Sequence, residues 1–137
     1  LYAEYSQGSI GNALKISSSS EFINMREDVI KWFTSIKHKS LSSVLLIADE
    51  MKIYKDNKEF LDIAYMWYRD ILSYKKVQDS NFVIQKDKLS SIIQESEMYK
   101  EEEIIKALEA IMSAKIQLSQ NGSFQVCMEV MLIKIKG

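Results

Sequence analysis

The chain has 137 residues, of which 47% are hydrophobic and 27% charged, and its 18 basic and 19 acidic side chains nearly cancel. This length predicts one domain with a core that needs no disulfide. The balanced charge argues against a broad surface for nucleic acid or an anionic membrane. No apolar run reaches the roughly 20 residues of a membrane span. The absence of proline and the presence of only four glycines favour long helices.

The first residues are expected to stand apart from the rest. Because the sequence opens on Leu1, we interpret it as a piece of a longer protein. Residues 1–16 predict two short helices, and the serine run 17–20 predicts a linker. We therefore expect a remnant of a preceding unit over 1–17 and one helical domain over 18–137. Ser18 and Glu21 have the spacing of a capping box that would begin the next helix.

Three helices are predicted before residue 77 by apolar residues at helical spacing. The first ends at the basic run 37–39, and Ser40 is expected to cap the second. Asp56 and Glu59 have capping-box spacing before the third. The residues expected to point inward are Phe22, Met25, Val29, Trp32, Phe33 and Ile36 in the first, Leu41, Val44, Leu45, Ala48 and Met51 in the second, and Phe60, Leu61, Ala64, Trp67, Tyr68, Ile71 and Leu72 in the third.

Residues 77–86 lose this periodicity and predict a loop or extended segment, and 89–94 predict a short helix. A long helix is expected from Glu103, after the acidic run 101–103 that suits its positive end. Its predicted inward residues are Ile104, Leu108, Ile111, Met112 and Leu118.

The last segment, 124–136, follows a polar break at 121–123 and is apolar on nearly every side. Its end alternates like a strand, but its Met, Gln, Glu and Leu content favours a helix. A helix of this kind must be covered by its own bundle or by another subunit. The whole predicts an all-α fold, an orthogonal bundle of five to six helices.

Residues that could carry chemistry are few and isolated. His38 lies between lysines, and Cys127 lies among apolar residues, where a thiol behaves as a small hydrophobic group. The acidic run 101–103 lacks the alternating ligands and central glycine of a calcium loop. No acid, base and nucleophile occur together. We therefore expect a non-catalytic interaction domain with no catalytic residue, cofactor or metal.

The stretch 118–132 resembles the C-terminal signature of bacterial clamp-loader subunits, L-x-x-N-x-N-x-x-L-x-L-E-x-L-L. The positions that match are Leu118, Asn121, Glu129, Met131 and Leu132; Ser123, Val126 and Met128 replace an Asn and two Leu. The stretch 65–72 resembles the W-x-R-D-[IL]-L helix of delta-prime subunits of DNA polymerase III. Residues 7–14 resemble the last helix of the lid in AAA+ clamp loaders, with Gly11 where ATP-hydrolysing members have an arginine.

This resemblance implies a helical collar domain of a delta-prime-type subunit. Such domains form a ring that holds the loader together while it places the sliding clamp on primed DNA. The implied partners are the gamma/tau and delta subunits, with DNA contacted only indirectly. The implied location is cytoplasmic, at the nucleoid-associated replication machinery. The parent would belong to a DNA-directed DNA polymerase holoenzyme, whereas this fragment would bind no ATP and hydrolyse nothing.

The candidate residues for a subunit interface or a structural motif are Trp67, Tyr68, Arg69, Asp70, Asn121, Glu129 and Met131. Trp67 and Tyr68 suit either the core or an interface. Arg69 and Asp70 are expected to project from the opposite side of their helix and to pair within the bundle or across a subunit boundary. For Asn121 we expect a turn role, and for Glu129 a contact with a neighbouring helix end.

Two other functions remain open. The first is an adaptor that binds a partner helix in an apolar groove, which predicts a groove lined by Met and Leu. The second is direct DNA binding, which predicts that Lys75, Lys76, Lys86 and Lys88 cluster as a basic stripe.

Overall fold

The structure is a computed structural model that describes residues 19–137. In this range the chain forms α-helices joined by 3-10 turns, with no strand, which confirms the all-α bundle. The helices are α2 (Ser19–Ser35), α3 (Leu41–Glu50), α4 (Glu59–Val77), α5 (Leu89–Met98), α6 (Glu101–Ser119) and α7 (Phe124–Lys136). The 3-10 turns are η1 (Ile36–His38), η2 (Met51–Tyr54), η3 (Ser80–Phe82) and η4 (Lys86–Lys88). The predictions for residues 1–18, including the Ser18 cap and the lid-like helix, lie outside the described residues.

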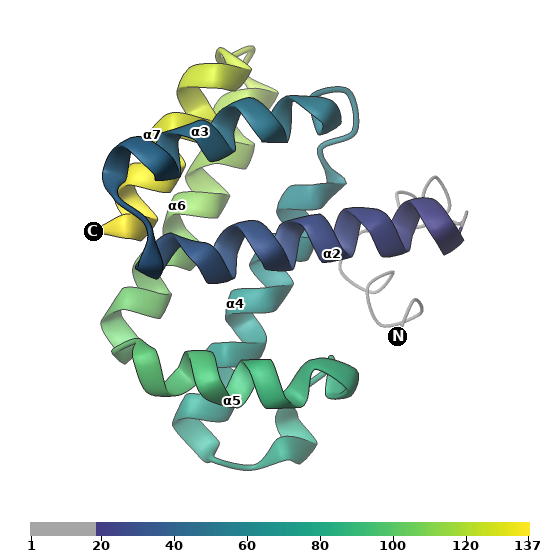
Figure 1. The fold of residues 1–137 in the computed structure, drawn as a ribbon, viewed down its shortest axis with the longest axis vertical. Coiled ribbons are helices and arrows are strands. Elements are labelled where there is room, and N and C mark those ends of the chain that lie inside the picture. The colour runs from purple at the N-terminus through teal and green to yellow at the C-terminus, as the bar shows by residue number, and fades with distance from the viewer. Residues whose placement is uncertain (1–18) are drawn as a thin grey trace.

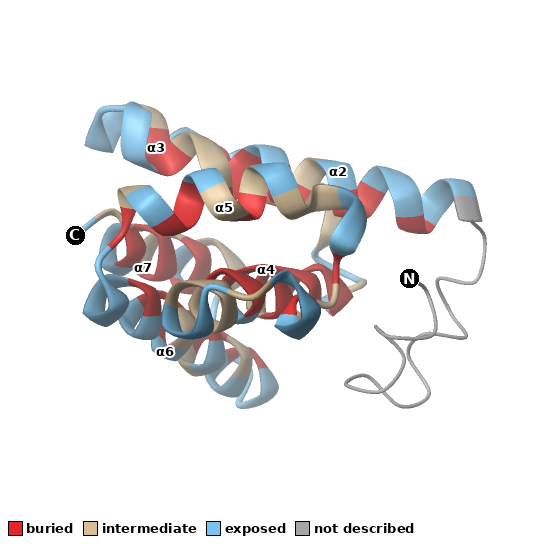
Figure 2. Ribbon diagram, turned by 90° about the horizontal axis from the view of Figure 1, so that it is seen from below, coloured by how far each residue is buried: buried red, intermediate tan, exposed pale blue. Residues whose placement is uncertain are grey.

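The helices pack in two layers. In Figure 1, α4 and α6 run along the long axis, and α2 and α5 cross them steeply at different heights. In Figure 2, α2, α3 and α5 lie on one side and α4, α6 and α7 on the other, with buried residues where the layers face each other. α7 lies between α3 and α6, and it packs against both.

The core between these layers is rich in aromatic side chains. Phe33, Phe60, Trp67 and Tyr68 have no exposed surface. Phe33 and Tyr68 make an edge-to-face contact with ring centroids 5.8 Å apart, a favoured geometry for aromatic pairs. The predicted inward faces of the first and third helices are therefore confirmed, with Leu72 partly buried.

Two inward residues were predicted wrongly. Leu41 is 49% exposed, and Ile47 is buried in α3 instead. Met112 is 40% exposed because the face of α6 that enters the core consists largely of small residues, Ala107, Ala110 and Ala114. Alanine permits close packing of helices. A prediction that counts mainly the larger apolar residues therefore misplaces the buried face of α6.

The caps also divide into confirmed and corrected predictions. The hydroxyl of Ser40 accepts a hydrogen bond from the Ser43 backbone N–H, as expected of a helix cap. The predicted capping box of Asp56 and Glu59 is wrong, because α4 begins at Glu59, and Asp56 lies too early to cap it. Asn57 accepts the hydrogen bond from the Glu59 N–H instead, at 3.4 Å.

The remaining segments follow the expectations closely. α5 extends four residues beyond the predicted end at 94. Between α4 and α5, Val83 is extended and 1% exposed, so it anchors the segment to the core, whereas Phe82 is exposed. The last segment is a helix and not a strand, and the Ser123 hydroxyl accepts a bond from the Val126 N–H at its start.

Candidate functional site

The aromatic candidates in α4 belong to the core. Trp67 and Tyr68 are fully buried, and the Tyr68 ring lies edge-on to Phe33 and also to Tyr99, whose centroid is 6.3 Å away. Burial raises the pKa of the Tyr68 phenol well above its usual value, so the phenol is neutral. These two residues therefore pack in the core, which is one of the two places expected for them.

The neighbouring Arg69 and Asp70 lie in different environments. Arg69 is exposed, whereas Asp70 is 1% exposed. The Asp70 carboxylate accepts the backbone N–H of Ile84 and of Gln85, each at 2.9 Å, and the side-chain amide of Gln85 at 3.1 Å. The expected position on the opposite side of the helix is wrong for Asp70, which is buried, whereas its pairing within the bundle is one of the two expected alternatives.

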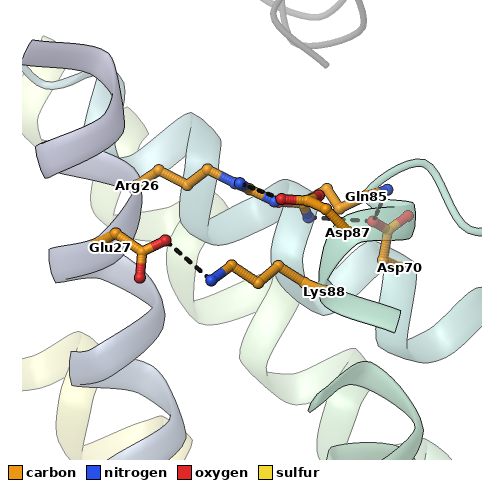
Figure 3. A network of polar contacts seen from close by, with 6 residues as sticks. All are labelled: Arg26, Glu27, Asp70, Gln85, Asp87 and Lys88. Atoms are coloured by element: carbon orange, nitrogen blue, oxygen red, sulfur yellow. Dashed lines mark hydrogen bonds and ion pairs between the residues drawn. The ribbon is translucent and has the colours of Figure 1, made fainter. Parts of the chain in front are cut away.

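The Asp70 contacts continue into a network that the sequence did not reveal (Figure 3). Arg26 of α2 donates through both terminal nitrogens to the carboxylate of Asp87 at 2.8 Å, and through Nε to Gln85 at 3.3 Å. This bidentate pair holds the pKa of Asp87 below its usual value. Lys88 and Glu27 form an adjacent ion pair at 2.9 Å. The network fastens the segment before α5 to α2 and α4, and its partners are too far apart in sequence for spacing to indicate them.

The polar break between α6 and α7 is a Schellman turn. Asn121 has a positive φ of 65°, its N–H donates to the Leu118 carbonyl, and the Gly122 N–H donates to the Gln117 carbonyl at 2.8 Å. Asn121 is exposed, so its place in the turn accounts for it without any partner.

The two candidates in α7 also have local explanations. Glu129 accepts a hydrogen bond from Gln125, one turn earlier in the same helix, at 3.0 Å. The expected contact of Glu129 with a neighbouring helix end is thus wrong; Gln125 makes that contact, donating to Asp49 at 3.2 Å. Met131 is 1% exposed and packs in the core.

The surface of the last two helices carries two strips of apolar residues. On α6, Ile105, Met112 and Ile116 are 38%, 40% and 50% exposed and share one face. On α7, Val126 and Ile133 are 55% and 44% exposed, on the side of the helix away from its buried residues. We call these the α6 strip and the α7 strip. The sequence did not identify these exposed residues individually, although the excess of apolar residues in the last helix indicated that part of its surface would need covering.

A groove of about 720 Å³ lies beside the α6 strip. It is lined by Lys106, Glu109, Ala110, Met112, Ser113 and Lys134. Four of these six residues are charged or polar, which does not match the groove of Met and Leu expected for binding a partner helix.

The four lysines considered for DNA binding are occupied by other contacts. Lys76 pairs with Glu101 at 3.4 Å, and Lys88 pairs with Glu27. Lys75 and Lys86 donate to backbone carbonyl oxygens at 2.8 and 2.9 Å. Each of these charges is therefore directed at one of the protein's own acceptors.

The structure offers little that resembles a reaction centre in residues 19–137. No group of three or more His, Cys, Asp or Glu side chains in this range could hold a metal ion. Cys127 is a buried free thiol, as predicted. None of the helices described is both long and apolar enough to cross a membrane.

Comparison with family models, with curated proteins and with solved structures gave no match to this chain. The clamp-loader interpretation therefore rests on the sequence stretches quoted above.

Proposed function

We propose that this chain is a non-catalytic oligomerisation domain of a clamp-loader subunit of the delta-prime type. Its role would be to hold the loader ring together while the sliding clamp is placed on primed DNA. The observation that carries the proposal is the pair of apolar strips on α6 and α7, the two helices joined by the turn within the stretch 118–132 that resembles the clamp-loader signature.

A subunit in a ring with unlike neighbours needs two different faces, one for each neighbour. The α6 strip and the α7 strip lie on separate helices, and each exposes side chains that gain free energy when covered. By contrast, Trp67, Tyr68 and Met131 are already covered by the chain itself. The proposed contact surface therefore consists of the strips and not of the motif residues first considered.

The adaptor function has less support. An amphipathic partner helix needs an apolar groove, whereas the groove beside α6 contains two lysines and a glutamate. A partner docking there would have to bury those charges or pair them, which costs free energy.

The proposal is tested by mixing the chain with the C-terminal regions of gamma/tau and delta subunits of the same organism and measuring mass by sedimentation. We expect a heteromer at micromolar concentration, where an interface of standard size is detectable. Failure of every mixture to form one would overturn the proposal.

A further inference from the structure

A second pocket lies on a different part of the molecule, between the end of α2 and α5. Its volume is about 370 Å³, enough for a group of several heavy atoms. It is lined by Ile30, Thr34, Ser35, His38, Ser91, Gln94, Glu95 and Met98. Polar side chains outnumber apolar ones in this lining, so the pocket suits a polar occupant.

Glu95 is the unusual member of this wall. The residue is 5% exposed, and its Oε1 atom is buried without a hydrogen-bond partner among the described residues. Burial raises the pKa of Glu95 to about 7. A buried carboxylate without a partner is costly, so a group that pairs with Glu95 would bind favourably.

The hydroxyl groups beside it also present acceptors. Thr34 donates its proton to the Ile30 carbonyl at 2.7 Å, and Ser35 donates to the Trp32 carbonyl at 2.8 Å. Because those protons are already donated, the lone pairs of the two hydroxyl oxygens remain free to accept hydrogen bonds from a ligand. The wall of the pocket thus combines one carboxylate with hydroxyl acceptors.

The chain's own charges near Glu95 leave it without a counter-ion in contact. Lys37 lowers the pKa of Glu95 through its charge, but its Nζ pairs with Glu103 at 3.3 Å and lies 4.7 Å from the centre of the Tyr99 ring. Tyr68 and Tyr99 also face Glu95, and both are neutral phenols because burial raises their pKa values. His38 lines the same pocket and is the remaining titratable group in its wall.

We propose that this pocket binds an ammonium or guanidinium group, with the Glu95 carboxylate as its counter-ion and Thr34 and Ser35 as additional acceptors. The ligand would be a small organic amine or the end of a lysine or arginine side chain. The inference does not depend on the clamp-loader proposal, since it needs no other subunit.

The test uses the full chain with ethylguanidinium chloride as probe, followed by the carboxyl carbon resonance of Glu95 in NMR spectra. We expect saturable binding and a lowered pKa of Glu95, because the probe pairs with the ionised form. The apparent affinity should fall about tenfold for each pH unit below 7, as the carboxylate becomes protonated.

Two matched variants decide whether Glu95 is responsible. Glu95→Gln keeps the shape and removes the charge, and its affinity should fall at least about tenfold, the effect of roughly 1.4 kcal/mol. Glu97→Gln removes an equal charge from an exposed position on α5 and should bind as the parent does. Equal affinity of the Glu95→Gln variant, or no saturable change in the parent, overturns the inference.

A capped tripeptide with a central arginine separates the two sources of the cation. Tighter binding of the peptide than of ethylguanidinium would assign a protein side chain as the ligand. Tighter or equal binding of the small probe would assign a free amine.

Discussion

At the scale of single residues, Asp70 joins α4 to the segment before α5. Its carboxylate is buried and accepts three hydrogen bonds from the segment before α5. Both carboxylate oxygens must accept hydrogen bonds, because the Ile84 N–H donates to one and Gln85 donates to the other. A residue with only one acceptor oxygen cannot replace it.

Asp70→Asn should therefore destabilise the fold by about 1–3 kcal/mol, the cost of leaving a buried donor unsatisfied. Urea unfolding followed by circular dichroism measures the change. Arg69→Gln, at the exposed neighbouring position, is the control and should stay within about 0.5 kcal/mol. Equal stability of the two variants would show that the Asp70 contacts do not hold the segment.

The burial of Glu95 makes the stability of the folded chain depend on pH. In the folded state its pKa is about 7, against an ordinary value of 4.5. Between these values the folded chain binds more protons than the unfolded chain, so stability falls as the pH rises towards 7. Glu95→Gln should melt at the same temperature as the parent near pH 4 and at a higher temperature at pH 8.

The melting temperatures of parent, Glu95→Gln and Glu97→Gln across this range provide the check. Differences between variants cancel the opposite contribution of Asp87, whose pKa is lowered by Arg26. If the gap between Glu95→Gln and the parent does not widen with pH, Glu95 is not buried in its ionised form.

Sequence reasoning found few of these residue-level contacts. Asp70 was singled out, and pairing within the bundle was one of the two roles expected of it. Its burial was not expected, because helical spacing does not tell which polar residue beside a buried face turns inward. The pair of Arg26 and Asp87 joins positions 61 residues apart, and no local pattern indicates such a contact.

At the scale of elements, the turn between α6 and α7 sets how those helices meet. Gly122 occupies a site with no room for a side chain. An added Cβ would lie 2.8 Å from the Gln117 carbonyl oxygen and 3.0 Å from the Cys127 sulfur. The nearest atom belongs to the backbone of Gln117 and not to a flexible side chain, so it cannot easily move aside.

Gly122→Ala should lower the free energy of unfolding by about 1–3 kcal/mol, the usual range for overpacking. Asn121→Gly is the matched control, because glycine adopts the positive φ at that position without strain and should leave stability nearly unchanged. Chemical denaturation of both variants tests this, and a neutral Gly122→Ala would contradict the close approach.

The helices themselves were largely predictable, because apolar periodicity and the serine caps at 40 and 123 are local signals. The errors arose where tertiary packing decided the outcome. Alanines of α6 entered the core in place of Met112, and Asn57 took over the capping expected of Asp56.

At the scale of the whole molecule, the excess of apolar residues in α7 has two outcomes. Five of its residues are buried against neighbouring helices, and Val126 and Ile133 remain exposed. The sequence predicted that this helix would be core, interface or both, but it could not locate the exposed side, which depends on how α3 and α6 cover the helix.

We propose that the strips on α6 and α7 bind neighbouring subunits. Ile116→Glu and Ile133→Glu, combined in one chain, place charges on both strips without entering the core. Ile53→Glu, at a 69% exposed position in η2, is the control for a charge placed outside them.

The most direct test is the dissociation constant for gamma/tau and delta C-terminal regions, measured by analytical ultracentrifugation for these variants and the parent. We predict that the double variant loses at least about tenfold in affinity, as expected when interface residues are replaced by charges, and that the Ile53→Glu variant binds like the parent. Equal binding by all three chains, with folding unchanged, would contradict the account.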